Sequence, residues 1–325
     1  MAASSASFMA RHEFLIRRLH SLSGLIPVGA YMCVHLVTNS TLLDSPGTFQ
    51  NAVYAIHSLG SFLPIVEWTF IFLPILFHAI VGVIIIRGGL PNSSSYPFAR
   101  NVRYTLQRAS GMIAFLFIVW HVFQLHGWFH FESWLEVAKP LGGAQFHPYA
   151  AASSVGSALQ GVLVQVLYAV GILSCVFHLA NGIWTMGITW GVWTSRAAQK
   201  RADVACGIFG VLLAAVGLGA LGGAATVDVE KAKAIEDKIY NAKLAAGEIN
   251  PNPHKRGEHT EHGTEAEPSA LTPAAETATS LTRPGRNDSA RIVSPPDQLS
   301  AEPSEPSEVV SPGHSGTVDT APSSR

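Results

Sequence analysis

Residues 61–86 read SFLPIVEWTFIFLPILFHAIVGVIII, an apolar run whose only ionisable side chains are Glu67 and His78. A bilayer core takes about 20 apolar helical residues to cross, so this run is long enough to span a membrane. Four further runs of this kind precede the polar end of the chain. They predict an all-α membrane protein with five transmembrane helices. The other predicted spans are 21–43, 106–126, 158–190 and 204–225.

The composition changes along the 325-residue chain, of which only 13% is charged. We predict an N-terminal segment over 1–20 and a five-helix transmembrane domain over 21–225. The polar tail over 226–325 is rich in Pro, Ser, Ala and Glu, which predicts disorder beyond a possible short helix at 227–248. The three cysteines form no C-x-x-C, so no disulfide framework or iron–sulfur spacing is present. No feature points to a nucleic-acid partner.

Basic residues alternate between the two sides of the predicted bundle. They precede the first span and occupy the second and fourth connections, whereas the first connection has none and the third has only Lys139. The positive-inside rule therefore places the N-terminus on the cytoplasmic side of the membrane and the tail on the outer side.

The first four spans each contain one histidine well inside the apolar run, and the fifth has none. Ionisable residues within membrane helices are rare and mark functional sites. At about 1.5 Å per residue, His35 and His121 lie about 20 Å from the cytoplasmic ends of their helices. His78 and His178 lie lower, at about 14 Å and 16 Å on the same estimate. The histidines therefore fall into two levels, His35 with His121 and His78 with His178.

Two imidazoles from opposing helices at one level suit the axial positions of haem. Two levels predict two haem b groups in a four-helix core, with the fifth helix beside it. A copper or zinc site is disfavoured, because its ligands would converge at one level. A single membrane histidine more often serves a helix–helix hydrogen bond or a proton relay. A transporter or channel with a histidine relay is therefore an alternative of a different class.

Polar residues near the ends of the spans are further candidates for cofactor or quinone contact. His20 and three arginines lie at the cytoplasmic edge, where they can meet haem propionates or a partner as well as set the topology. Glu67 lies near the outer end of its span. It either rests in the headgroup region or exchanges protons with a quinone. The three arginines are Arg17, Arg18 and Arg108.

Four stretches resemble the cytochrome b558 membrane-anchor subunit of bacterial succinate dehydrogenase, the five-helix, two-haem type related to the anchor of fumarate reductase. The resemblance covers about residues 11–225 and includes all four histidine motifs in order. The tail departs from the family, whose chains normally stop after the fifth helix. The stretches are EFLIRRLHSLSGLIPVGAYMCVHLVTNS (13–40), FIFLPILFHAIVG (70–82), LQRASGMIAFLFIVWHV (106–122) and FHLANGIWTMGITWG (177–191).

The resemblance implies that His35 and His121 bind an outer, low-potential haem, and that His78 and His178 bind an inner, high-potential haem. It also implies a flavoprotein subunit and an iron–sulfur subunit docked on the cytoplasmic side, and a place in the tricarboxylic acid cycle. Electrons would pass through both haems to menaquinone near the outer face. This chain itself carries no flavin motif and performs no succinate chemistry.

The resemblance also implies that family members working as fumarate reductases use further membrane carboxylates for proton movement. The spans here offer little beyond Glu67, which favours succinate oxidation. A remaining alternative within the electron-transfer class is a di-haem cytochrome b subunit of a hydrogenase or formate dehydrogenase. The stretches RRLHSLSG (17–24) and HLANG (178–182) argue against it.

Overall fold

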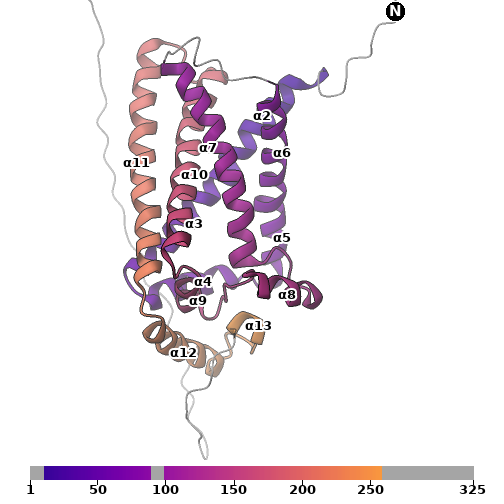
Figure 1. Cartoon of the computed structure of the whole chain (residues 1–325), viewed down its shortest axis with the longest axis vertical. Helices are drawn as coiled ribbons and strands as arrows, with labels where there is room; N and C mark the ends of the chain where they lie inside the picture. The colour runs from indigo at the N-terminus through magenta and orange to yellow at the C-terminus, as the bar shows by residue number, and fades with distance from the viewer. Residues whose placement is uncertain (1–10, 89–98, 258–325) are drawn as a thin grey trace, which may run out of the picture. The chain divides into compact units, whose positions relative to one another are not determined.

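The structure is a computed structural model, and it describes residues 11–88 and 99–257. These residues form helices and no strand, and five long apolar helices run side by side (Figure 1). The predicted all-α fold with five membrane-spanning helices is therefore confirmed. The spans are Glu13–Leu43, Gly60–Arg87, Asn101–His126, Val162–Thr189 and Arg196–Thr226.

The first two spans each contain a widened π-helical turn beside a proline. The first consists of α2 (Glu13–Ser23), the π segment η1 (Gly24–Gly29), α3 (Ala30–Ser40) and η2 (Thr41–Leu43). The second consists of η3 (Gly60–Phe62), α5 (Leu63–Glu67), the π segment η4 (Trp68–Phe72) and α6 (Leu73–Arg87). Pro27 lies inside η1, and Pro74 follows η4. Proline lacks an N–H group and crowds the preceding turn, so wider turns accommodate it without ending the span.

The other three spans contain no proline, and the fourth and fifth are single α-helices. The third joins α7 (Ala99–His121) to the π segment η5 (Val122–His126), the fourth is α10 (Val162–Thr189), and the fifth is α11 (Arg196–Thr226). The fourth begins later than predicted, because Gly161 has φ of 107° and separates it from a short preceding helix. A positive φ of this kind is readily adopted only by glycine.

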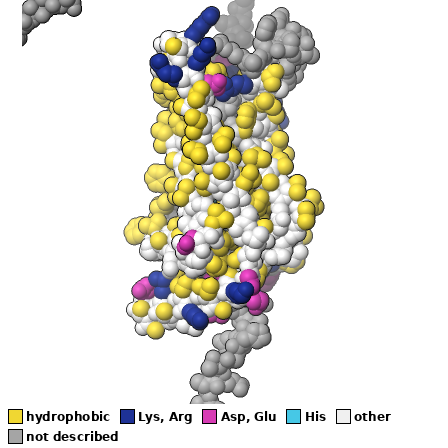
Figure 2. All heavy atoms as spheres, turned by 90° about the vertical axis from the view of Figure 1, so that its left-hand side faces the viewer, with side chains coloured by type: hydrophobic (Ala, Val, Ile, Leu, Met, Phe, Trp, Pro, Cys, Tyr) yellow, Lys and Arg dark blue, Asp and Glu magenta, His cyan; other side chains and the backbone are white. Residues whose placement is uncertain are grey.

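The two ends of the bundle differ. The proximal end is the one at which α2 begins, and the distal end carries the short helices that connect the spans (Figure 1). Viewed from the α11 side, hydrophobic side chains cover the middle of the bundle, and charged side chains gather towards its ends (Figure 2). This distribution suits a bilayer-spanning protein. The short distal helices are α4 (Pro46–His57), α8 (Glu132–Ala138), η6 (Lys139–Leu141) and α9 (Ala151–Ala158).

The region predicted as a polar tail begins with a folded part. The expected helix at 227–248 is present as α12 (Val229–Ala245), and α13 (Pro253–Arg256) follows it. Residues 227–257, hereafter the distal cap, pack on the distal end through α4 and α9. The predicted disorder over the remainder concerns residues 258–325, which lie outside the described residues.

Candidate functional site

His78 of α6 and His178 of α10 face each other in the proximal half of the bundle. Their ring centroids are 6.0 Å apart and their planes are nearly perpendicular, at 87°. Each ring is hydrogen-bonded to the backbone of a further helix, α2 for His78 and α7 for His178. His78 Nδ1 donates to the carbonyl oxygen of His20 at 2.9 Å, and His178 Nδ1 donates to that of Gln107 at 3.0 Å. Because carbonyl oxygens only accept, both histidines keep the proton on Nδ1 and leave Nε2 free.

Glycines make this close approach possible. A Cβ atom at Gly24 would collide with the His78 ring, and one at Gly111 would lie 2.7 Å from Cε1 of His178. Each glycine lies four residues after the residue whose carbonyl accepts the imidazole proton. The two helix pairs, first with second and third with fourth, therefore use the same local design. In the sequence this design corresponds to a glycine four residues after a His or Gln in each of the four spans. The segments are HSLSG (20–24), HAIVG (78–82), QRASG (107–111) and HLANG (178–182).

His35 of α3 and His121, the last residue of α7, form a second pair nearer the distal end. Their ring centroids are 5.8 Å apart, with an interplanar angle of 80°. His121 Nδ1 lies 3.2 Å from the hydroxyl of Tyr168, which itself donates to Oε1 of Gln124 at 3.0 Å. The Tyr168 oxygen therefore accepts the His121 proton. This pair differs from the proximal pair, because the Nδ1 proton of His121 goes to a network of side chains, whereas those of His78 and His178 go to helix carbonyls.

Both pairs have dimensions that fit one metal between two imidazoles. Metal–imidazole bonds of about 2 Å bring the two nitrogens about 4 Å apart and the ring centroids roughly 6 Å apart. Within the described part of the chain, no group of three or more His, Cys, Asp or Glu side chains is arranged to hold a metal ion. The arrangement is pairwise, as the two axial positions of haem b require.

The candidate residues at the proximal edge separate into two groups. The ring of His20 stacks on His78 at 4.0 Å and 13°, so it belongs to the proximal pair's surroundings. Arg108 reaches from α7 to α6, donating to the carbonyl of Ile85 at 3.4 Å. Arg17 is exposed and pairs with Glu13, whereas Arg18 lies over the rings of Phe14 and Trp190.

The outer candidates lie towards the distal end. Glu67 is the last residue of α5 and is half-buried. Further along that span, the Phe72 ring is 5.5 Å from the ring of His126, which in turn is 4.4 Å from that of His130. Nδ1 of His126 is buried without a hydrogen-bond partner among the described residues. Aromatic and imidazole groups thus gather where the second and third spans approach the distal end.

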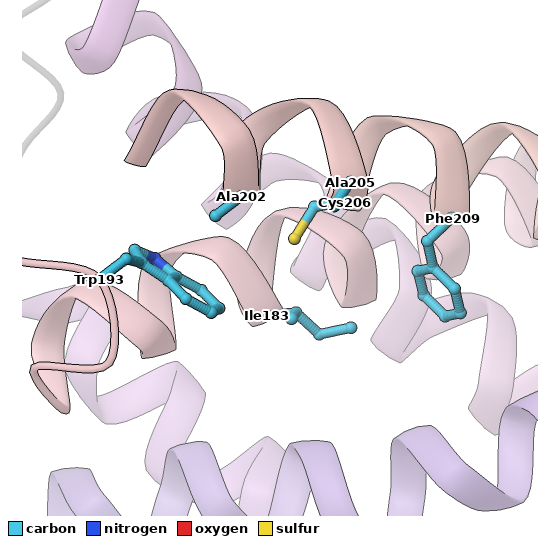
Figure 3. Close-up of a pocket in the computed structure, with 6 residues that line it drawn as sticks. All are labelled: Ile183, Trp193, Ala202, Ala205, Cys206 and Phe209. Carbon is cyan, nitrogen blue, oxygen red and sulfur yellow. The ribbon is translucent and has the colours of Figure 1, made fainter. Parts of the chain in front are cut away.

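A separate apolar pocket of about 280 Å³ lies between α10 and the start of α11 (Figure 3). Its lining holds one titratable side chain, Cys206, and none of the paired histidines. The pocket is therefore a packing feature of the fifth span and not part of the histidine site. The lining residues are Ile183, Trp193, Ala202, Ala205, Cys206 and Phe209.

Sequence reasoning missed the residues that orient the imidazoles. Gln107, Gln124 and Tyr168 are polar but uncharged, so they did not stand out among the ionisable groups. Their signal was polarity inside an apolar run, since Gln124 and Tyr168 are only 5% exposed. The glycine spacing was a second signal that went unused.

The fold and the two facing imidazole pairs place this chain in the class of multi-pass membrane bundles with paired interior histidines. No protein-family model matches the sequence. The chain is 34% identical over 209 residues to the succinate dehydrogenase cytochrome b558 subunit of Bacillus subtilis (strain 168), a match that covers 64% of this chain and 96% of that relative. It therefore belongs to the family of succinate dehydrogenase cytochrome b558 subunits, which confirms the resemblance seen in the sequence.

Proposed function

We propose that this chain anchors a succinate dehydrogenase in the bacterial cytoplasmic membrane and carries electrons from its iron–sulfur subunit, by way of two haem b groups, to menaquinone. The observation that carries the proposal is the presence of two imidazole pairs, with centroid separations of 5.8 Å and 6.0 Å, at two levels of one bundle. Haem b, when bound, supplies the one-electron chemistry. The protein residues hold it and set its surroundings.

His78 and His178 are the proposed ligands of the inner, high-potential haem, and His35 and His121 those of the outer, low-potential haem. The Nδ1 hydrogen bonds of His78, His178 and His121 support this assignment, because they leave Nε2 of each ring available to iron. Such outer contacts fix the tautomer and ring orientation of a metal ligand and raise its basicity.

Two further residues are proposed to act at the inner haem. His20 stacks on a proposed ligand, and the Arg108 guanidinium bridges α7 and α6; we propose that both meet propionates of this haem. Arg17 is exposed, and Arg18 lies over the ring of Phe14. These surroundings favour a role in setting the topology and in docking an acidic partner surface.

Glu67 is the proposed proton-exchanging residue of the quinone site near the outer haem. Its half-buried carboxyl group on the second span supports this role. Succinate oxidation is favoured over fumarate reduction, because the spans offer little beyond Glu67 to serve as the further membrane carboxylates expected of a fumarate reductase.

The proximal end is the proposed cytoplasmic side, where the flavoprotein and iron–sulfur subunits dock. The support is the positive-inside rule, since basic residues precede the first span and occupy the connections at this end. The distal cap would then lie on the outer side of the membrane.

A reduced-minus-oxidised spectrum of membranes containing the complex tests the proposal. We expect a b-type α-band with two haems per chain. His78→Ala should remove about half of the band and leave the outer haem, whereas His35→Ala should remove the other half. His254→Ala is the matched control, because this histidine lies in α13 outside the bundle. A complex without a b-type band would refute the proposal, and loss of the same haem in both variants would refute the pairing.

A further inference from the structure

Glu236 ties the distal cap to the start of α9. It is 0% exposed, and its carboxylate accepts from the backbone N–H of Ala152 at 2.6 Å and of Ser153 at 3.1 Å. The Ser153 hydroxyl donates to its second oxygen at 2.5 Å. The first N–H groups of a helix have no partner within the helix, and the helix dipole favours negative charge there. Glu236 therefore caps α9 from a distant part of the chain.

The docking of the cap on α9 is close along the length of the helix. A Cβ atom at Gly156 would collide with the Val227 side chain, so this glycine allows the two segments to touch. Gln50 of α4 adds a second clamp, because its amide donates to the Pro148 carbonyl at 2.8 Å and accepts from Ala151 N at 2.8 Å. The position of α9 is thus set by the distal cap and α4 together.

The other end of α9 is hydrogen-bonded to the network around His121. The carbonyl of Ala158, the last residue of α9, accepts from Nε2 of Gln124 at 3.0 Å. This contact fixes the amide so that Oε1 faces Tyr168, whose hydroxyl donates to it at 3.0 Å. The Tyr168 proton therefore points away from His121, and the phenol oxygen is left to accept from His121 Nδ1.

We propose that Glu236 is a positioning residue for His121, acting through α9, Gln124 and Tyr168, and that the distal cap thereby sets the redox potential of the outer haem. This inference rests on the proposed function, in which His121 is an axial ligand of that haem. The cap is the part of the chain that departs from the family pattern, so it adds a control that the five-helix bundle alone does not have.

The physical effect follows from the basicity of the His121 imidazole. A hydrogen bond from Nδ1 makes the ring a stronger donor to iron, which favours the ferric state and lowers the potential. Removal of Glu236 leaves buried N–H groups of α9 without an acceptor. When α9 shifts to relieve this, Gln124 loses its orienting carbonyl, and the Tyr168 contact to His121 weakens.

A redox titration of both haem bands in the full-length complex tests the proposal. Tyr168→Phe removes the contact to His121 directly. We expect the preference of the outer haem for the ferric state to fall about tenfold, which corresponds to a rise of about 59 mV in its reduction potential. Glu236→Ala should shift it in the same direction by about threefold, or about 28 mV. Glu236→Gln, which keeps one acceptor oxygen and the packing, should give a smaller rise. The inner haem serves as an internal reference and should not move.

Glu230→Ala is the matched control on the same helix, because Glu230 is exposed and pairs only locally with Lys233; it should leave both potentials unchanged. An outer shift in Tyr168→Phe with none in Glu236→Ala or Glu236→Gln would overturn the link through α9 while the proposed function stands. Equal shifts of both haems would also overturn it, since they would indicate general loosening. A complex with no b-type band would overturn the proposed function itself, and this inference with it.

Discussion

Replacing Gly111 by alanine should displace the His178 imidazole and weaken the inner haem selectively. The new Cβ atom would lie 2.7 Å from Cε1 and 3.0 Å from Nδ1 of the ring. Restoring an ordinary contact of 3.4 Å moves the ring by roughly 0.7 Å. A displacement of that size stretches the bond from Nδ1 to the Gln107 carbonyl, now 3.0 Å, beyond the usual hydrogen-bond range.

Opposing effects decide the size of the change. Gly→Ala within a helix stabilises it by about 0.5–1 kcal/mol when the methyl group has room. Here crowding costs about 1–3 kcal/mol and the lost hydrogen bond about 0.5–1.5 kcal/mol. The central net loss is about 2 kcal/mol, which corresponds to roughly a 30-fold loss of haem affinity at the inner site.

The assay is haem content per chain, with the inner and outer α-bands measured separately in solubilised membranes. We expect Gly111→Ala to lose the inner band on dilution and to keep the outer one. Gly207→Ala in α11 is the matched control, because a Cβ atom there has no packing neighbour within 4 Å among the described residues. A Gly111→Ala complex with full inner haem content and an unchanged inner potential would refute the reasoning.

Two further predictions concern the distal cap. Gly156→Ala should push Val227 away from α9, which should lower the melting temperature and speed proteolysis after Lys255 and Arg256. Gly222→Ala is the control, because its Cβ atom has no packing neighbour within 4 Å among the described residues, and it should change neither measurement. Burial and the nearby Lys255 lower the pKa of His57 to about 4 from an ordinary 6.5. The unfolded state, in which His57 of α4 has left its packing against the cap, therefore binds more protons between these values, so stability should rise as the pH increases from about 4 to 6.5. In His57→Gln, the free energy of unfolding should no longer rise over this pH range. An unchanged slope of that free energy against pH would count against a neutral buried His57.

The bundle was predictable because membrane spans leave a coarse signal. Long apolar runs locate the helices, and a constant helical rise converts residue counts into depth. This is why His35 was expected beside His121 and His78 beside His178, and the structure brings these rings together. The start of the fourth span was predicted less accurately, because α9 ends at Ala158 and α10 begins only after Gly161, a break that the hydropathy of the run does not reveal.

The distal cap and the imidazole network could not be read in the same way. Glu236 lies in a charged segment, where the sequence pattern resembles an exposed helix. Its burial is favourable only because the N-terminus of α9, more than 80 residues away, presents three donors to it. Tyr168 likewise meets His121 through tertiary packing between two spans. Contacts of this kind depend on the assembled fold and leave no local periodicity.

The two imidazole pairs are built for different electrostatic surroundings. The ring of His20 stacks on His78, and the imidazole protons of the proximal pair go to helix carbonyls. The distal pair has a neutral phenol and amides around His121 instead. With haems bound as proposed, the proximal ligands keep contacts to helix carbonyls, whereas the His121 contact depends on side chains that can rearrange. Adjusting the hydrogen bond of His121 would then be the means by which the distal cap tunes the outer site alone.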